Sequence, residues 1–328
     1  EKRLGRKFWA ALVIFGLMGQ VAWVVENMYF NVFIYKMFHA SAADISLMVG
    51  VSSVAAAVTT IFAGAFTDYI GKRKVFICGG YIAWGISILA FAFIRVDVLT
   101  PIAGSALQAA ALGITLVIVL DCVMTFLGSS ANDACFNAWM TDWGDGSNRG
   151  KIEGINSMMP LAAILAVFGG FSAFDLDRAE SWSMIYLIVG VMVLLIGILG
   201  IFLIDENGKA RVRECGEREA HKGKEELCRD RRKDGTAEGE GAAENKNAVD
   251  EKRSYKVNLV YSFRLSVVKE NPLLYAVLGA FAVFGISINI FMPYLILYYE
   301  KTLGMDNYVM IMAPAIVLAA AATACYGN

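Results

Sequence analysis

The chain has 328 residues, of which 57% are apolar and only 18% are charged, and its formal net charge is −1. Soluble globular domains carry roughly 25% charged residues, so this composition argues against an ordinary soluble protein. The balanced charge, without any basic–aromatic surface pattern, also gives no support to nucleic-acid binding.

Eight apolar runs are each long enough to cross a bilayer, for which about 20 apolar residues in a helix suffice. They lie at roughly 8–38, 45–66, 75–94, 112–140, 155–174, 182–204, 273–299 and 308–326. The sequence therefore predicts an all-α membrane protein with eight transmembrane helices.

The cations of the short loops indicate how these helices are oriented, because loops rich in Lys and Arg stay in the cytosol. With the N-terminus inside, the inner loops carry nine Lys or Arg residues and the outer loops carry four. This bias predicts a multi-pass protein of the cell membrane with a cytoplasmic N-terminus.

The long polar segment 205–271 holds 16 of the 29 Lys and Arg residues and 15 of the 30 Asp and Glu residues. A segment with so much mixed charge and so few apolar residues cannot bury a core. We therefore expect an N-terminal six-helix bundle over 1–204, a cytoplasmic charged linker over 205–271, and the first two helices of a C-terminal bundle over 272–328.

A weak internal repeat relates the two parts of the chain. A shift of 263 residues places Tyr35 on Tyr298 and Gly64 on Gly327, with the spacing kept over two helices and a loop. Parallel repeats of this kind are typical of transporters. Because the sequence stops just after Gly327, we expect a fragment that contains eight helices of twelve.

The turn between the second and third spans reads GAFTDYIGKRK at 64–74. Its pattern of Gly64, Asp68, Gly71, Lys72 and Arg73 resembles the loop 2–3 signature of the major facilitator superfamily. The resemblance implies that family's helical bundle and secondary transport of a small solute by alternating access.

The resemblance also implies a charged cytoplasmic gate. The alternative, a solvated loop that follows the positive-inside rule, explains the cations of this turn but not its acid and glycines. The expected gate residues are Gly64, Asp68, Gly71, Lys72, Arg73, Asp133, Asp142 and Arg149. Asp133 is included because it lies about 18 Å beyond Asp121 along helix four, at 1.5 Å per residue, which is expected to take it to the cytoplasmic end of that helix.

A narrower likeness concerns DWGDGSNRG at 142–150 and FMPYLILYYEKTLGM at 291–305. These stretches are similar to glycoside–pentoside–hexuronide cation symporters and to sucrose-type proton symporters, which implies a sugar or glycoside as the solute. The sodium-binding carboxylates that such symporters carry on helix two are missing from VSSVAAAVTTIFAG at 51–64. Protons are therefore expected as the coupling ion in preference to sodium.

Acidic residues inside the apolar runs are the sharpest signal, because a carboxylate at a helix centre costs about 2.5–3.5 kcal/mol on insertion scales. Glu26 lies in the first span, and Asp121 lies in the fourth. Protonation is an alternative to burying the charge. Our hypothesis is that both reach a central cavity and that one carries a coupling proton, the alternative being that each only hydrogen-bonds within the bundle.

Helical spacing of about 100° per residue groups further polar side chains on these two spans. Asn132 falls on the stripe of Asp121, whereas Asp133 falls on another face. The expected substrate-binding residues are Gln20, Trp23, Asn27, Asn31, Asn132 and Asn289, the last being the repeat image of Glu26.

Catalytic and metal chemistry have little support in the sequence. It has two histidines, no CxxC among its six cysteines and no nucleophile–base pair. We therefore expect no enzyme activity, no cofactor and no metal, and as partners the lipid bilayer, a small-molecule substrate and protons. The alternatives are a drug–proton antiporter, a non-transporting membrane receptor or an inactive fragment.

Overall fold

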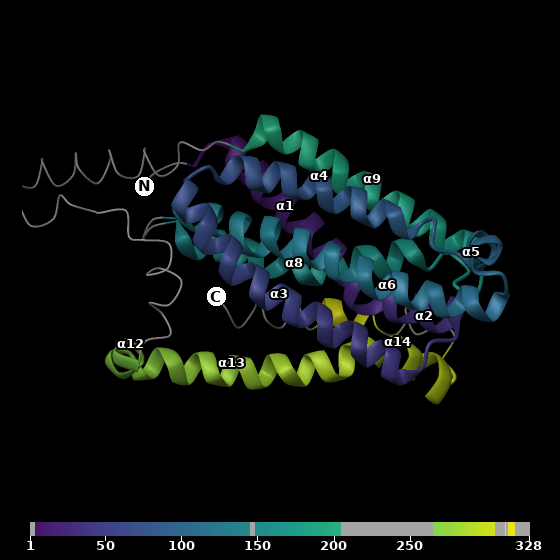
Figure 1. Cartoon of the computed structure of the whole chain (residues 1–328). Coiled ribbons are helices and arrows are strands. Elements are labelled where there is room, and N and C mark those ends of the chain that lie inside the picture. The colour runs from purple at the N-terminus through teal and green to yellow at the C-terminus, as the bar shows by residue number, and fades with distance from the viewer. Residues whose placement is uncertain (1–3, 145–147, 205–264, 306–311, 313, 319–328) are drawn as a thin grey trace, which may run out of the picture.

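The computed structural model describes residues 4–144, 148–204, 265–305, 312 and 314–318, and these are helical apart from short connections (Figure 1). Seven helices in this described part are long and apolar enough to cross a membrane. They coincide with the first seven predicted spans. The predicted eighth span, 308–326, lies almost entirely outside the described residues.

The first three spans begin close to where the apolar runs begin. The first span consists of α1 (Arg6–Val24), η1 (Val25–Tyr29) and α2 (Phe30–Phe38), the second of α3 (Ala42–Ile70), and the third of α4 (Arg73–Phe91). A short helix, α5 (Val96–Ala103), follows the third span and is one that the hydropathy pattern does not predict.

The remaining spans follow in the same up-and-down order. The fourth consists of α6 (Ala106–Gly128), η2 (Ser129–Phe136) and α7 (Asn137–Trp143), the fifth of α8 (Arg149–Phe171), and the sixth of α9 (Ala179–Leu203). Beyond residues 205–264, which are not described, come α12 (Leu265–Glu270), α13 (Pro272–Phe291), η3 (Met292–Tyr294), α14 (Leu295–Leu297) and η4 (Tyr298–Thr302).

Three of the spans contain a π-helical segment, in which the backbone holds more residues per turn than an α-helix. These segments are η1 in the first span, η2 in the fourth and η4 in the seventh. Such segments interrupt the 100° periodicity on which any face assignment from sequence depends.

The bundle is held together by close helix contacts with small residues at the crossing points. Helices α4 and α9 run side by side over their length (Figure 1), and a Cβ added at Gly197 would lie 2.7 Å from the backbone nitrogen of Ile82. Large aromatic side chains such as Trp84, Trp182 and Tyr186 are fully buried between helices. The outward faces are apolar, for example at Leu107 and Phe202, as lipid contact requires.

The two ends of the bundle can be told apart by the second span. At its start, Ser41 and Asp44 form a reciprocal capping box on α3. At its other end, Gly71 adopts φ +73° and donates its N–H to the carbonyl of Thr67 over 2.8 Å. We call the end that carries Gly71, Lys72 and Arg73 the basic end, and the other the capped end.

Helix α13 lies beside the first six spans without being packed into them. None of its residues is buried, and it runs from α12 near the basic end toward α14 at the capped end (Figure 1). Contact with the first six spans comes at the capped end, where Tyr294 lies 2.8 Å from the hydroxyl of Ser46 and donates to the carbonyl of Ala42 over 3.1 Å.

Candidate functional site

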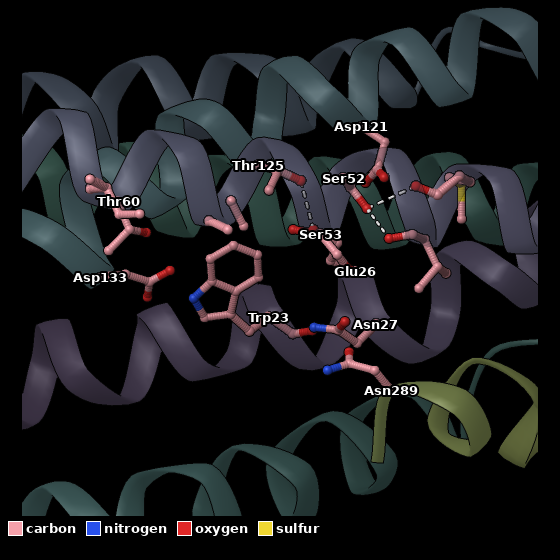
Figure 2. A pocket seen from close by; sticks show the side chains of 15 residues that line it. Trp23, Glu26, Asn27, Ser52, Ser53, Thr60, Asp121, Thr125, Asp133 and Asn289 are labelled. Atoms are coloured by element: carbon pink, nitrogen blue, oxygen red, sulfur yellow. Dashed lines mark hydrogen bonds between the residues drawn. The ribbon is translucent and has the colours of Figure 1, made fainter. Parts of the chain in front are cut away.

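A cavity of about 670 Å³ lies among the first, second, fourth and seventh spans (Figure 2). Its wall is built from α1, η1, α3, α6, η2 and α13. Small-molecule sites measure about 300–1,000 Å³, so this cavity is large enough for a metabolite or a drug-sized ligand.

Three carboxyl groups line this cavity, and we call Glu26, Asp121 and Asp133 the cavity acids. No Lys, Arg or His occurs among the residues that line the cavity in the described part of the chain. The wall therefore offers negative charge and hydrogen-bond acceptors without a basic residue to neutralise them.

Glu26 is held at the cavity by the π segment η1 and by the fourth span. Its side chain is 7% exposed, and its Oε1 accepts a hydrogen bond of 2.8 Å from the hydroxyl of Thr125. Its other oxygen, Oε2, is buried and has no hydrogen-bond partner in the described structure. A buried acceptor without a partner costs about 1–3 kcal/mol, and more if it is charged.

Asp121 has a similar environment one turn before Thr125 on α6. Its side chain is 1% exposed, and its Oδ1 has no hydrogen-bond partner among the described residues. Figure 2 shows Ser52 of α3 beside it. Two nearly enclosed carboxyl groups thus each leave one oxygen available to a proton or to a ligand.

Asp133 lies on the cavity wall instead of at the helix end where sequence spacing places it. Two features explain the difference. The π segment η2 changes which residues share a face, and the fourth span continues to Trp143, about 15 Å beyond Asp133 at 1.5 Å per residue. Its carboxylate accepts a hydrogen bond of 3.1 Å from the amide of Asn132.

Three of the predicted substrate-binding residues line the same cavity: Trp23, Asn27 and Asn289. In Figure 2 the indole nitrogen of Trp23 points toward Asp133, and Asn27 and Asn289 lie close together. Each amide nitrogen already donates to its own helix, from Asn27 to the Trp23 carbonyl over 2.8 Å and from Asn289 to the Gly285 carbonyl over 3.0 Å. The amide oxygens remain as the groups these residues present.

The other three predicted residues, Gln20, Asn31 and Asn132, are not part of the cavity lining. Asn31 is fully buried and donates to the Asn27 carbonyl over 2.7 Å. Asn132 accepts a hydrogen bond of 2.8 Å from the hydroxyl of Tyr81. These contacts place Asn31 and Asn132 in helix packing, so their substrate role stays a prediction.

The second span contributes a wall that the sequence analysis overlooked. Met48, Val49, Ser52, Ser53, Ala56, Ala57, Thr60 and Ile61 all face the cavity. Their spacing follows i, i+3, i+4 and i+7, which is the repeat of one helix face. This spacing is visible in VSSVAAAVTTIFAG, but its small and hydroxyl side chains carry no charge that distinguishes a cavity wall from a packing face.

At the basic end, the expected gate residues are partly brought together. Arg73 Nη1 lies 2.9 Å from Asp142 Oδ2, which joins the start of α4 to the end of α7. Lys72 and Arg149 are exposed, and Gly64 has open space beside it. The side chain of Asp68 lies outside the described part, so its expected contacts remain predictions.

Comparison with known proteins gives one match. The family model described as Major Facilitator Superfamily matches residues 8–327, which is nearly the whole chain. No curated protein and no solved structure matches the chain.

Proposed function

The chain belongs to the major facilitator superfamily, and we propose that it moves a small polar solute across the membrane by alternating access, coupled to protons. The membership makes it a secondary transporter of that superfamily, with a bundle of membrane-spanning helices and a small-molecule substrate. Alternating access in transporters is largely a rocking of one half of the protein against the other around a central site.

Proton coupling is supported by Glu26 and Asp121, and this is the observation that carries the proposal. Each is nearly enclosed, and each has a carboxyl oxygen without a hydrogen-bond partner in the described structure. Ionisable groups within membrane helices mark proton and substrate pathways in transporters. A proton bound at either group neutralises the site, and its release to water restores the charge.

The ion pair between Arg73 and Asp142 supports a gate at the basic end. It joins the third and fourth spans near the turn that contains Gly71. With the basic end in the cytosol, as the loop cations favour, this pair lies at the inner mouth of the cavity. Because both residues belong to the first six spans, we propose that this pair holds the basic ends of the third and fourth spans together as the two halves rock.

The solute class is open to two candidates. Sequence resemblance favours a sugar or glycoside, for which Asn27 and Asn289 offer amide oxygens. A drug–proton antiporter is favoured by the three cavity acids, because the described lining contains no basic residue and a cationic drug could pair with the acids. Protons suit both candidates better than sodium, because the second span contributes hydroxyl groups but no acid to the cavity.

The test is uptake into proteoliposomes that contain the purified chain. A pH gradient of either direction is imposed, and entry of radiolabelled sugars and of radiolabelled organic cations is measured. We expect pH-driven uptake, and we expect Glu26→Gln and Asp121→Asn each to reduce it at least tenfold while the protein still inserts.

Glu153→Gln on α8 is the matched control, because Glu153 is an exposed acid away from the cavity. Unchanged pH-driven uptake in both cavity variants would contradict the proposal. Binding of a solute without flux would instead point to a receptor or to an inactive protein.

A further inference from the structure

We propose that the transported solute carries a positively charged organic group, and that this group binds between the indole ring of Trp23 and the cavity acids. The inference deepens the proposed function and rests on it in one respect, namely that this cavity is the transport site. It adds the chemical class of the solute, which membership of the superfamily leaves open.

The wall of the cavity carries acids without a basic residue in its described lining. All three cavity acids belong to that lining. Described ion pairs lie at the ends of the bundle, for example between Arg73 and Asp142 and between Lys36 and Glu300, and none of these four residues lines the cavity. With a neutral solute, only bound protons could neutralise the three acids, whereas a cationic solute compensates their charge directly.

Two carboxyl oxygens of the cavity acids have no hydrogen-bond partner in the described structure. Glu26 Oε2 and Asp121 Oδ1 are both buried without a hydrogen-bond partner, on side chains that are more than nine-tenths buried. A buried carboxylate normally has a donor or a counter-charge, because its burial alone is unfavourable. A cationic ligand supplies what these two oxygens lack.

Trp23 places an aromatic ring on the same cavity wall as the acids. Its ring packs against Trp84 with centroids 5.6 Å apart, and in Figure 2 it lies between Asp133 and Asn27 on the cavity wall. Trp is the aromatic side chain that attracts cations most strongly through the face of its ring. An aromatic surface beside carboxylates suits an ammonium or phosphonium group that carries apolar substituents.

A bare metal ion fits the site less well than an organic cation. In the part of the chain that the structure describes, no group of three His, Cys, Asp or Glu side chains could hold a metal ion. The cavity also measures about 670 Å³, which is far more room than a coordinated ion needs. Both facts favour a bulky organic molecule with a distributed positive charge.

The experiment compares two ions of the same shape and opposite charge, tetraphenylphosphonium and tetraphenylborate. Binding of each to the purified chain in a neutral detergent is measured by equilibrium dialysis. We expect saturable binding of tetraphenylphosphonium and none of tetraphenylborate. Binding of the phosphonium should strengthen as the pH rises from 5 to 8, because protons compete for the cavity acids.

Variants then assign the site. We expect Glu26→Gln and Asp133→Asn each to weaken phosphonium binding at least tenfold. Trp23→Leu should weaken it about fivefold, and Trp23→Phe should weaken it less than Trp23→Leu does. Glu153→Gln should leave binding unchanged. Circular dichroism and gel filtration confirm that each variant is folded.

Three results would overturn the inference: equal binding of both ions, no saturable phosphonium binding, or affinities within twofold of the original in all cavity variants. Proton-driven uptake of a labelled sugar by a protein that binds no phosphonium would remove the inference and leave the proposed function standing. Phosphonium binding without any flux would contradict the proposed function and would leave only the cation site of the inference standing, without its role in transport.

Discussion

Asn132 shows how a polar side chain within a membrane span can serve packing instead of transport. Its Oδ1 accepts a hydrogen bond of 2.8 Å from the buried hydroxyl of Tyr81, and the carbonyl oxygen of Phe15 lies 3.1 Å from the same hydroxyl. A Cβ added at Gly19 would approach Asn132 Oδ1 to 2.5 Å. The first, third and fourth spans therefore meet at one polar contact that needs a glycine beside it.

Removal of the Tyr81 hydroxyl tests how much this hydrogen bond contributes to the stability of the folded protein. Tyr81→Phe leaves Asn132 Oδ1 without its donor in a buried site, which costs about 1–3 kcal/mol. We expect a lower temperature of thermal unfolding in detergent. Tyr69→Phe is the matched control, because the Tyr69 side chain on α3 is 58% exposed. Equal unfolding temperatures for the two variants would show that the contact contributes little.

At the scale of the element, α4 and α9 depend on glycines that admit a neighbouring backbone. Gly85 of α4 lies against the Leu194 backbone nitrogen, 2.6 Å from where a Cβ would stand, and Gly190 of α9 lies against Leu89. Close approach through small residues is the usual means of helix association in membranes, since lipid gives no hydrophobic driving force. The α4–α9 pair is thus a structural support behind the cavity wall.

Gly197→Ala should destabilise this helix pair although alanine favours helices more than glycine does. The added methyl group would lie 2.7 Å from the Ile82 nitrogen, so a backbone must move, and such overpacking costs about 1–3 kcal/mol. Gly79→Ala on α4, where nothing lies within 4 Å, should be neutral or stabilising. Thermal unfolding of the two variants separates packing from helix propensity, and a similar shift in both would argue against the close contact.

Sequence reasoning succeeded where a single physical quantity decides the outcome. Uncharged length alone predicts the first seven spans, because about 20 apolar residues match the bilayer. The insertion cost of a carboxylate singled out Glu26 and Asp121, and both line the cavity. The basic turn at 64–74 led to the superfamily, which the match over residues 8–327 confirms.

The same reasoning failed where the backbone departs from a regular helix. The stripe through Asp121 and Asn132 assumed 100° per residue, but η2 interrupts that repeat and brings Asp133 to the cavity instead. No residue pattern in 129–136 predicts a π-helical segment. The short helix α5 was also missed, because its eight residues carry no transmembrane signal.

At the scale of the whole molecule, the two parts of the chain are joined at the capped end. Lys36 Nζ lies 2.9 Å from Glu300 Oε2 and 3.2 Å from Asp177 Oδ1, and the side chains of Lys36 and Glu300 are only 11% and 16% exposed. Tyr294 adds its contacts to α3 nearby. Helix α13 has no buried residue, so in this conformer the described contacts that join η3 and η4 to the first six spans lie at the capped end, while α13 itself is not packed into the bundle.

Breaking the Lys36–Glu300 pair should shift the protein away from this conformer. Glu300→Gln removes the nearer of the two carboxylates that pair with Lys36 and leaves that ammonium with the exposed Asp177 alone, so the ion pair between the two parts of the chain is lost. We expect Glu300→Gln to slow the labelling of a cysteine at position 60, on the cavity wall, by an impermeant thiol reagent added on the basic-end side. The measurement uses a protein whose native cysteines have been replaced.

The double variant Lys36→Glu with Glu300→Lys exchanges the two charges and should restore the labelling rate. Lys301→Ala is the control, because Lys301 is a neighbouring exposed cation, and it should leave the labelling rate unchanged. The role of the pair would be excluded if Glu300→Gln and Lys301→Ala were labelled alike.

The π segments η1 and η2 have a consequence for how the gene can change. Each amounts to about one codon more than an uninterrupted α-helix would use, because a π turn carries an additional residue. An in-frame deletion of one codon within 25–29 would remove the additional residue and let the helix close into a regular form, so Lys36 and the other later side chains of that span would keep roughly their present faces. A deletion of one codon in the α-helical part of the same span would instead turn every later side chain by about 100°. The loss of one triplet should therefore be tolerated better inside a π segment than elsewhere in these spans.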